Sequence, residues 1–347
     1  MRISFFSLPG LALVVLSLSG SGMAKTVPRN CNALSWPDVN PVWSMCWVSP
    51  DLSSGVDGSG LELYNVQYKG QEVLFKADIP VLNVLYEPGG CGGPYLSFRD
   101  WGNELSPFQA DNVVSPGLAE PATAPKTTCN HPGSDRGSFE GVAIQKGIDS
   151  LILTTQMTAG WYRYIQTWTF YADGSFSPRL AFTAIYNPCI FHLHTHNIYW
   201  RLDFDIDNYA DDVVDIGPHL IADQCCWTPI ATETSDKRSV PFLKTGLWRV
   251  RNKTTGRGYV IMDNSSDGVA DSFGDADRWV LKYHSNELDD GGATTGPYGD
   301  AIHIDKYLNG EKVDGADVVV WYHAGHLHKS PLACVPIGPL IVPFGSW

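Results

Sequence analysis

Histidines and aspartates alternate along one short segment of the chain, residues 192–207. Three imidazoles and then three carboxylates stand there at every second position: His192, His194, His196, Asp203, Asp205 and Asp207. In a strand, residues two apart point to the same face. The segment therefore predicts a strand that presents imidazoles at one end and carboxylates at the other.

A second segment, residues 317–328, carries the same residue types in the reverse order. Asp317 opens it, and three histidines follow near its end: His323, His326 and His328. Two such strands side by side could build one imidazole site and one carboxylate site. Imidazole suits copper or zinc, whereas carboxylate and carbonyl oxygens suit calcium. Three imidazoles accept both copper and zinc, so the residues themselves leave that choice open.

Short alternating runs rich in β-branched and aromatic residues fill most of the chain, and long helical periodicity is nearly absent. Gly, Pro, Asn and Asp separate these runs, which is typical of an all-β sandwich or barrel. We expect strands over 61–68, 162–171, 175–185, 201–207 and 317–322, with a hairpin turn at Asp173-Gly174.

The N-terminal segment has a basic start, an apolar stretch and small residues up to Ala24, as secretory signal peptides do. We expect a signal peptide over 1–24, an N-terminal extension over 25–55 and one domain over 56–347. The eight cysteines fit an oxidising compartment, although sequence alone does not pair them. Asn252 and Asn264 begin glycosylation sequons. The protein is therefore expected to be secreted.

The composition excludes several classes of function. The formal net charge of −13 argues against binding to nucleic acid or to anionic membranes, because those partners require clusters of Lys and Arg. No apolar run after the signal segment is long enough to span a bilayer. The sequence has no phosphate-binding loop, no dinucleotide fingerprint and no nucleophile elbow. Nucleotide chemistry and serine hydrolysis therefore have no support.

Several motifs in order resemble the catalytic domain of copper amine oxidases. Residues 194–203 are similar to the family's His-x-His copper strand, and residues 321–328 to the strand that supplies the third ligand. Residues 158–164 are similar to the cofactor motif Thr-x-x-Asn-Tyr-Asp/Glu-Tyr, and residues 336–344 to the C-terminal segment. The resemblance covers the chain from about residue 43 to its end. It implies an all-β, large antiparallel β-sandwich and a homodimer.

The resemblance also implies two metal sites. The copper ligands would be His194, His196 and His328. A calcium-like ion would be held by the side chains of Asp203, Asp205 and Asp317 and by the carbonyls of Phe204 and Val318. The remaining histidines of the two strands would be bystanders, supporting groups or alternative ligands: His192, His323 and His326.

The same resemblance assigns the catalytic groups. Tyr162 would be the tyrosine that is oxidised to topaquinone, Tyr86 a hydrogen-bonding neighbour of that cofactor, and Asp100 the general base. In this mechanism a primary amine, water and O₂ give an aldehyde, ammonia and H₂O₂. A carboxylate buried beside an apolar channel has a raised pKa and can abstract a proton at neutral pH.

Several positions depart from the family's pattern, among them Ala333-Cys334, which stands where the family has two acids. Trp161 replaces the motif's Asn, Arg163 replaces its acid, and Phe98 stands at the position of a gating Tyr. Two alternatives to an amine oxidase therefore remain open. One is a metal-dependent biosynthetic enzyme of isomerase, cyclase or oxygenase type with an unmodified Tyr162. The other is a secreted metal- or ligand-binding protein without catalysis.

Overall fold

The fold consists of strands in two large sheets. The computed structural model describes residues 25–55, 58–86, 97–99, 109–110, 119–121, 125, 127–129, 141–159, 161–184, 187–218, 226–238, 246–270, 276–288, 304–328 and 334–347. Strands make up 54% of the structure, and these ranges contain no α-helix, only short 3-10 turns at Pro50–Leu52 (η1), Pro188–Phe191 (η2) and Ile304–Tyr307 (η4). The predicted all-β sandwich is confirmed.

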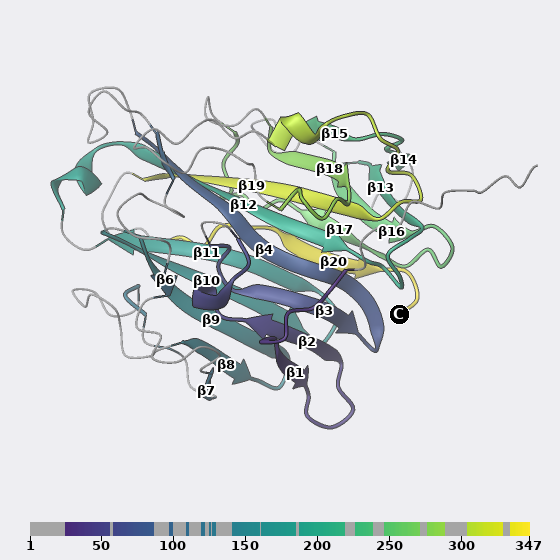
Figure 1. Cartoon of the computed structure of the whole chain (residues 1–347), viewed down its shortest axis with the longest axis horizontal. Coiled ribbons are helices and arrows are strands. Elements are labelled where there is room, and N and C mark those ends of the chain that lie inside the picture. Colours follow the sequence, from purple (N-terminus) through teal and green to yellow (C-terminus); the bar gives the residue numbers. More distant parts are fainter. Residues whose placement is uncertain are drawn as a thin grey trace, which may run out of the picture.

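The first sheet carries both histidine segments. Its order is β1 (Asn32–Trp36), β2 (Trp43–Val48), β3 (Glu62–Tyr68), β4 (Gln71–Tyr86), β12 (His194–Phe204), β19 (Val318–His328), β18 (Arg278–Lys282) and β15 (Thr234–Asp236), with β5 (Ser97–Arg99) beside β4. The long strands β4, β12 and β19 run side by side through its middle (Figure 1). Residues 32–48 of the expected N-terminal extension thus belong to this sheet.

The second sheet faces the first. Its order is β14 (Thr228–Pro229), β13 (Asp212–Ile216), β16 (Trp248–Asn252), β17 (Gly258–Met262), β20 (Leu340–Phe344), β11 (Phe176–Ala184), β10 (Tyr162–Tyr171), β9 (Ser150–Ala159), β8 (Val142–Lys146) and β7 (Ala119–Pro121), with β6 (Gln109–Ala110) beside β9. All described pairs are antiparallel except β7 with β8. β10 and β11 form the expected hairpin.

A tight turn joins β10 to β11. Gly174 has a φ of 91°, and a Cβ there would lie 2.6 Å from the ring of Tyr68. Glycine adopts this conformation without the steric penalty that other residues meet. The turn residues thus fix the register in which Tyr162 faces Ala184 across the hairpin.

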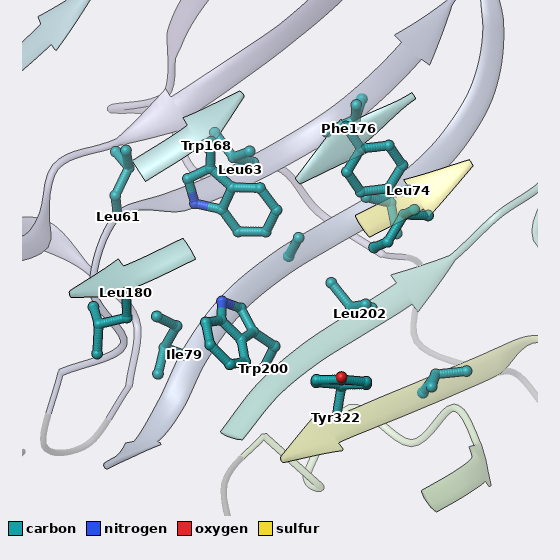
Figure 2. Close-up of a cluster of buried hydrophobic side chains, with 14 of the residues drawn as sticks. Leu61, Leu63, Leu74, Ile79, Trp168, Phe176, Leu180, Trp200, Leu202 and Tyr322 are labelled. Atoms are coloured by element: carbon teal, nitrogen blue, oxygen red, sulfur yellow. The ribbon is translucent and has the colours of Figure 1, made fainter. Parts of the chain in front are cut away.

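The main core lies between the sheets. Figure 2 shows Trp168 of β10 and Leu180 of β11 gathered with Ile79 of β4 and Trp200 of β12. Each large apolar side chain that is fully buried contributes about 1.5–3 kcal/mol. On β12 the even-numbered residues from Ile198 to Phe204 belong to this core, whereas Tyr199 belongs to a separate cluster on the outer face. Strand parity therefore decides which side chains reach the space between the sheets.

Covalent links add to the packing. Disulfides join Cys31 to Cys46 and Cys129 to Cys334, and Cys189 is also disulfide-bonded. No helix in the described part of the chain is long and apolar enough to cross a membrane. The expected signal peptide, residues 1–24, lies outside the described residues.

Candidate metal centre

Two neighbouring strands bring the predicted copper ligands together. β12 and β19 pair antiparallel, with His194 opposite His328 and His196 opposite His326. His194 and His196 are even-numbered like the core residues of β12, so their side chains enter the space between the sheets. The ligand nitrogens of His194, His196 and His328 all lie within 4.8 Å of one another, and all three residues are buried.

Hydrogen bonds select the nitrogen that each ring offers. His194 Nδ1 lies 2.6 Å from the carbonyl oxygen of His192, so it carries the proton that it donates. His196 Nδ1 lies 2.7 Å from the hydroxyl of Tyr164. Nδ1 of each ring is thus in a hydrogen bond, and Nε2 is the nitrogen that each ring would offer to a metal, as in metal-bound histidines fixed by a second hydrogen bond. His196 Nε2 is buried and has no hydrogen-bond partner among the described residues.

The electrostatics favour neutral, metal-binding imidazoles. Burial lowers the pKa of His194 to about 4, and the nearby His328 acts in the same direction. Burial and the neighbouring His194 and His328 lower the pKa of His196 well below its ordinary value. His194 Nε2 lies 2.9 Å from His328 Nδ1. At this distance the two nitrogens can share a proton in a hydrogen bond or bind the same metal ion. The three imidazoles fit copper and zinc equally well.

The opposite sheet supplies tyrosines to the same space. The Tyr162 hydroxyl lies 2.8 Å from His194 Nε2, and the centroid of the Tyr162 ring lies 4.6 Å from that of the His196 ring. Phe182 of β11 covers His196 at a centroid distance of 3.8 Å. Tyr162 and Tyr164 are both buried, because they are alternate residues of β10 on the face that meets the first sheet. The predicted cofactor tyrosine therefore lies against the predicted copper ligands.

The substituted motif residues have different surroundings. The Trp161 ring lies 5.9 Å from the Tyr162 ring and packs against the main core. Arg163 is buried, and its Nη1 donates to the carbonyl oxygen of Tyr162 at 2.9 Å. Adjacent strand residues point to opposite faces, so Arg163 meets the backbone of Tyr162 and not its ring.

Two predicted catalytic residues are described incompletely. Tyr86 is the last residue of β4, and its backbone stands opposite His194 in the strand register. Asp100 follows β5 in the sequence and lies outside the described residues. Phe98 pairs with Val84 of β4. The roles of Asp100 and Tyr86 thus stay predictions.

The other histidines of the two strands have different surroundings from the three predicted ligands. His192 is exposed and contributes its carbonyl, and His326 is half-buried with its ring 5.4 Å from that of Phe182. His323 lies on the outer face of β19, where Nδ1 is 2.8 Å from Asp277 Oδ1 and Nε2 is 2.9 Å from Asn197 Oδ1. Both nitrogens of His323 are therefore engaged away from the metal centre.

The predicted carboxylate site forms at the other end of β12. Oxygens of Asp203, Asp205 and Asp317 lie within 4.8 Å of one another. Asp203 and Asp205 have odd numbers, so this site is on the outer face of the sheet, away from the histidines. Phe204 pairs with Val318 at the same end of the strands. The side-chain nitrogen of Lys25 lies among the three carboxylates, where a calcium-like ion was expected.

The carboxylates of this site repel one another. Burial and the neighbouring Asp203 raise the pKa of Asp205 to about 8, and the same two causes raise the pKa of Asp317 to about 6, while Lys25 opposes both. Neither the place of Lys25 among the carboxylates nor a role for Tyr164 is predicted from the sequence. The Tyr-x-Tyr spacing of the cofactor motif could have indicated Tyr164, because residues two apart share a strand face. No local pattern marks Lys25.

Comparisons with known proteins support the fold. No model of a protein family matches the chain, and no curated protein sequence does. The structure is similar to a copper-containing benzylamine oxidase from Hansenula polymorpha, with a TM-score of 0.61 and 16% identity over 94% of this chain and 64% of that one. The structure is also similar to that of Pichia pastoris lysyl oxidase, with a TM-score of 0.61 and 15% identity over 99% of this chain and 59% of that one.

An amine oxidase from Aspergillus nidulans gives a TM-score of 0.58 and 14% identity over 98% of this chain and 55% of that one. The chain thus spans 55% to 64% of the length of these three proteins. At such identities the likeness establishes the fold alone. The chain therefore has a divergent copper amine oxidase-like fold that covers most of its length.

Proposed function

We propose that this chain is a secreted copper-dependent oxidoreductase that oxidises primary amines, with Tyr162 as the precursor of topaquinone. One observation carries the proposal: the Tyr162 hydroxyl lies 2.8 Å from the nitrogen by which His194 would hold copper. Bound copper would supply the one-electron chemistry with O₂, and the quinone would supply a carbonyl that condenses with amines. The remaining steps fall to residues of this chain.

His194, His196 and His328 would hold the metal and leave a position open for chemistry, as three-histidine sites do. Tyr164 would keep His196 in orientation through its 2.7 Å contact with Nδ1. The buried surroundings of Tyr162 would exclude water from its ring. Asp100, at the position of the family's base, would take the proton from the substrate carbon beside the nitrogen. The balanced reaction converts amine, water and O₂ into aldehyde, ammonia and H₂O₂.

Secretion is part of the proposal. The disulfides Cys31–Cys46 and Cys129–Cys334 support it, because such bonds form in oxidising compartments. The asparagine of the first sequon, Asn252, is fully buried, and its Nδ2 donates to the carbonyl oxygen of Ile206 at 3.0 Å. A glycan there would break this bond, so Asn264, which is partly exposed, is the better acceptor.

One observation favours the second candidate, a metal-dependent biosynthetic enzyme without a quinone. Trp161 packs against the core within 5.9 Å of the Tyr162 ring, where the family's smaller Asn would leave more room. A phenol held in place and left unmodified could donate or accept a proton beside a Lewis-acidic metal. In both readings the three histidines and Tyr162 form the site.

The proposal is tested by H₂O₂ release from a panel of primary amines by the copper-loaded protein. We expect turnover in the native chain and loss of at least about 100-fold in the Asp100→Asn variant, which removes the general base. Asp38→Asn is the control, since that side chain is 76% exposed and lies in the turn between β1 and β2. An unaffected Asp100→Asn variant would contradict the base assignment. Turnover of a non-amine without any amine oxidation would favour the second candidate.

A further inference from the structure

A lysine side chain sits among the carboxylates on the outer face of the first sheet. The Nζ of Lys25 lies 2.8 Å from Asp203 Oδ1, 2.6 Å from Asp205 Oδ1 and 2.8 Å from Asp317 Oδ1. An ammonium has three N–H donors, and here each one meets a different carboxylate. We refer to the three aspartates as the carboxylate cage.

The cage is a built site and not a chance surface contact. The Lys25 side chain is 11% exposed, and those of Asp203, Asp205 and Asp317 are 1%, 4% and 20% exposed. Two rings cover the ammonium: its nitrogen lies 4.4 Å from the centroid of Tyr283 and 5.1 Å from that of Phe75. Aromatic faces attract cations, and a desolvated pair of this kind is stronger than an exposed one.

The chain around Lys25 is fixed on the same face of the sheet. Val27 and Cys31 pack against a small cluster that contains Phe75, and the disulfide from Cys31 to Cys46 ties the segment to β2. Lys25 is therefore tethered close to the cage. A tethered group acts at a high effective concentration, so a dissolved cation competes with it at a disadvantage.

We propose that Lys25 is the resident cation of the carboxylate cage, and that the chain binds no divalent ion there while Lys25 is in place. Calcium requires six to eight oxygens at about 2.3–2.6 Å, and the space among these three oxygens holds the ammonium. The two cations would also repel each other at that distance. Lys25 thus links the N-terminal segment to β12 and to the start of β19 in place of a metal ion. This inference does not depend on the proposed oxidase activity.

The test compares the native chain with Lys25→Met, which keeps most of the side-chain length and removes the charge. Thermal unfolding is measured in EDTA and in millimolar CaCl₂, and bound calcium is counted by equilibrium dialysis. The N-terminus of each protein is checked by intact mass. The control is Lys253→Met, because Lys253 forms an exposed pair with Asp314 at 3.0 Å.

We expect the native chain to bind no calcium at the cage and to unfold at the same temperature in both buffers. Lys25→Met should unfold about 5 °C or more lower in EDTA, because it removes the ammonium that all three carboxylates share and leaves only Arg201, 3.7 Å from Asp203, as an ion-pair partner of this cluster among the described residues. In CaCl₂, Lys25→Met should bind one calcium ion, and its unfolding temperature should rise back to that of the native chain. The unfolding temperature of the control should differ from that of the native chain by about 1 °C or less. If Lys25→Met folds only with calcium, that result supports the proposal as well.

A second variant identifies the site of any calcium that is bound. Lys25→Met combined with Asp317→Asn should lose the calcium that Lys25→Met gains. Calcium bound by the native chain and lost in Asp317→Asn alone would overturn the proposal. A Lys25→Met variant that is as stable as the native chain in EDTA, or that takes up no calcium, would overturn it equally.

Discussion

Tyr164 contacts His196, the second of the predicted copper ligands. Its hydroxyl lies 2.7 Å from His196 Nδ1, and both side chains are buried. Partners of this kind fix the tautomer and the direction of a ligating ring. Copper affinity should therefore depend on Tyr164, although Tyr164 is not among the predicted ligands.

The Tyr164→Phe change removes this hydroxyl and leaves the ring. We expect copper affinity to fall by about 10- to 100-fold, which is typical when such a partner is lost. Competition with a chelator of known affinity measures the change. Tyr171→Phe, at the exposed end of the same strand, is the matched control and should bind copper as the native chain does. Equal affinities for the two variants would contradict the role of Tyr164.

At the scale of elements, strand parity on β12 and β19 separates the two sites. His194, His196 and Trp200 face the space between the sheets, whereas Asp203 faces the opposite way. Trp200 shares its face with the predicted metal ligands, and its ring lies 6.3 Å from that of Tyr322 on β19. The packing of Trp200 therefore helps to keep the two ligand strands in their places.

Replacing Trp200 with Ala should destabilise the protein by about 3–5 kcal/mol, because it leaves a cavity in the core. The free energy of unfolding is measured with a chemical denaturant. Ile148→Ala is the control, since Ile148 is 93% exposed and surface changes cost about 0.5 kcal/mol or less. A Trp200→Ala variant as stable as the control would contradict this view of the core.

The sequence predicted the parts of the fold that depend on local pattern. The strand expected over 162–171 is observed as Tyr162–Tyr171, and the turn at Asp173-Gly174 follows it. The strand expected over 201–207 is observed as His194–Phe204, so it begins earlier and ends earlier. Alternation reveals which face a residue takes, but strand ends also depend on neighbouring strands, here β4 and β19.

The contents of the carboxylate cage were not predictable from the sequence. Lys25 is separated from the three aspartates by 178, 180 and 292 residues, and no repeat or spacing connects them. The cluster of His194, His196 and His328 was predictable because paired motifs with matching flanks marked these residues. Lys25 is not part of a recognisable motif, so its contact with the three aspartates is seen only in the folded chain.

For the whole molecule, the longer disulfide should contribute more stability than the shorter one. Cys129–Cys334 closes a loop of 205 residues, and Cys31–Cys46 closes one of 15 residues. In the chain-entropy account a loop near 15 residues contributes about 3 kcal/mol and a much longer loop about 5 kcal/mol. The larger loop also joins a segment before β8 to the segment that follows β19.

Replacing both cysteines of each pair by Ser tests this difference. We expect the Cys129/Cys334 variant to lose more free energy of unfolding than the Cys31/Cys46 variant, as measured with a denaturant at constant pH. The reverse order would indicate that the N-terminal segment, with Lys25, contributes more to the free energy of unfolding than the long loop.

Size-exclusion chromatography with light scattering on the native chain tests the proposed homodimer.

Tyr162, beside the predicted copper ligands, is the residue on which the proposed amine oxidation depends most. The decisive measurement is the mass of the proteolytic peptide that contains Tyr162, from protein reconstituted with copper in air. We predict a gain of two oxygen atoms and a loss of two hydrogen atoms, the composition of topaquinone. An unmodified mass, with copper confirmed at His194, His196 and His328, would contradict the amine oxidase mechanism.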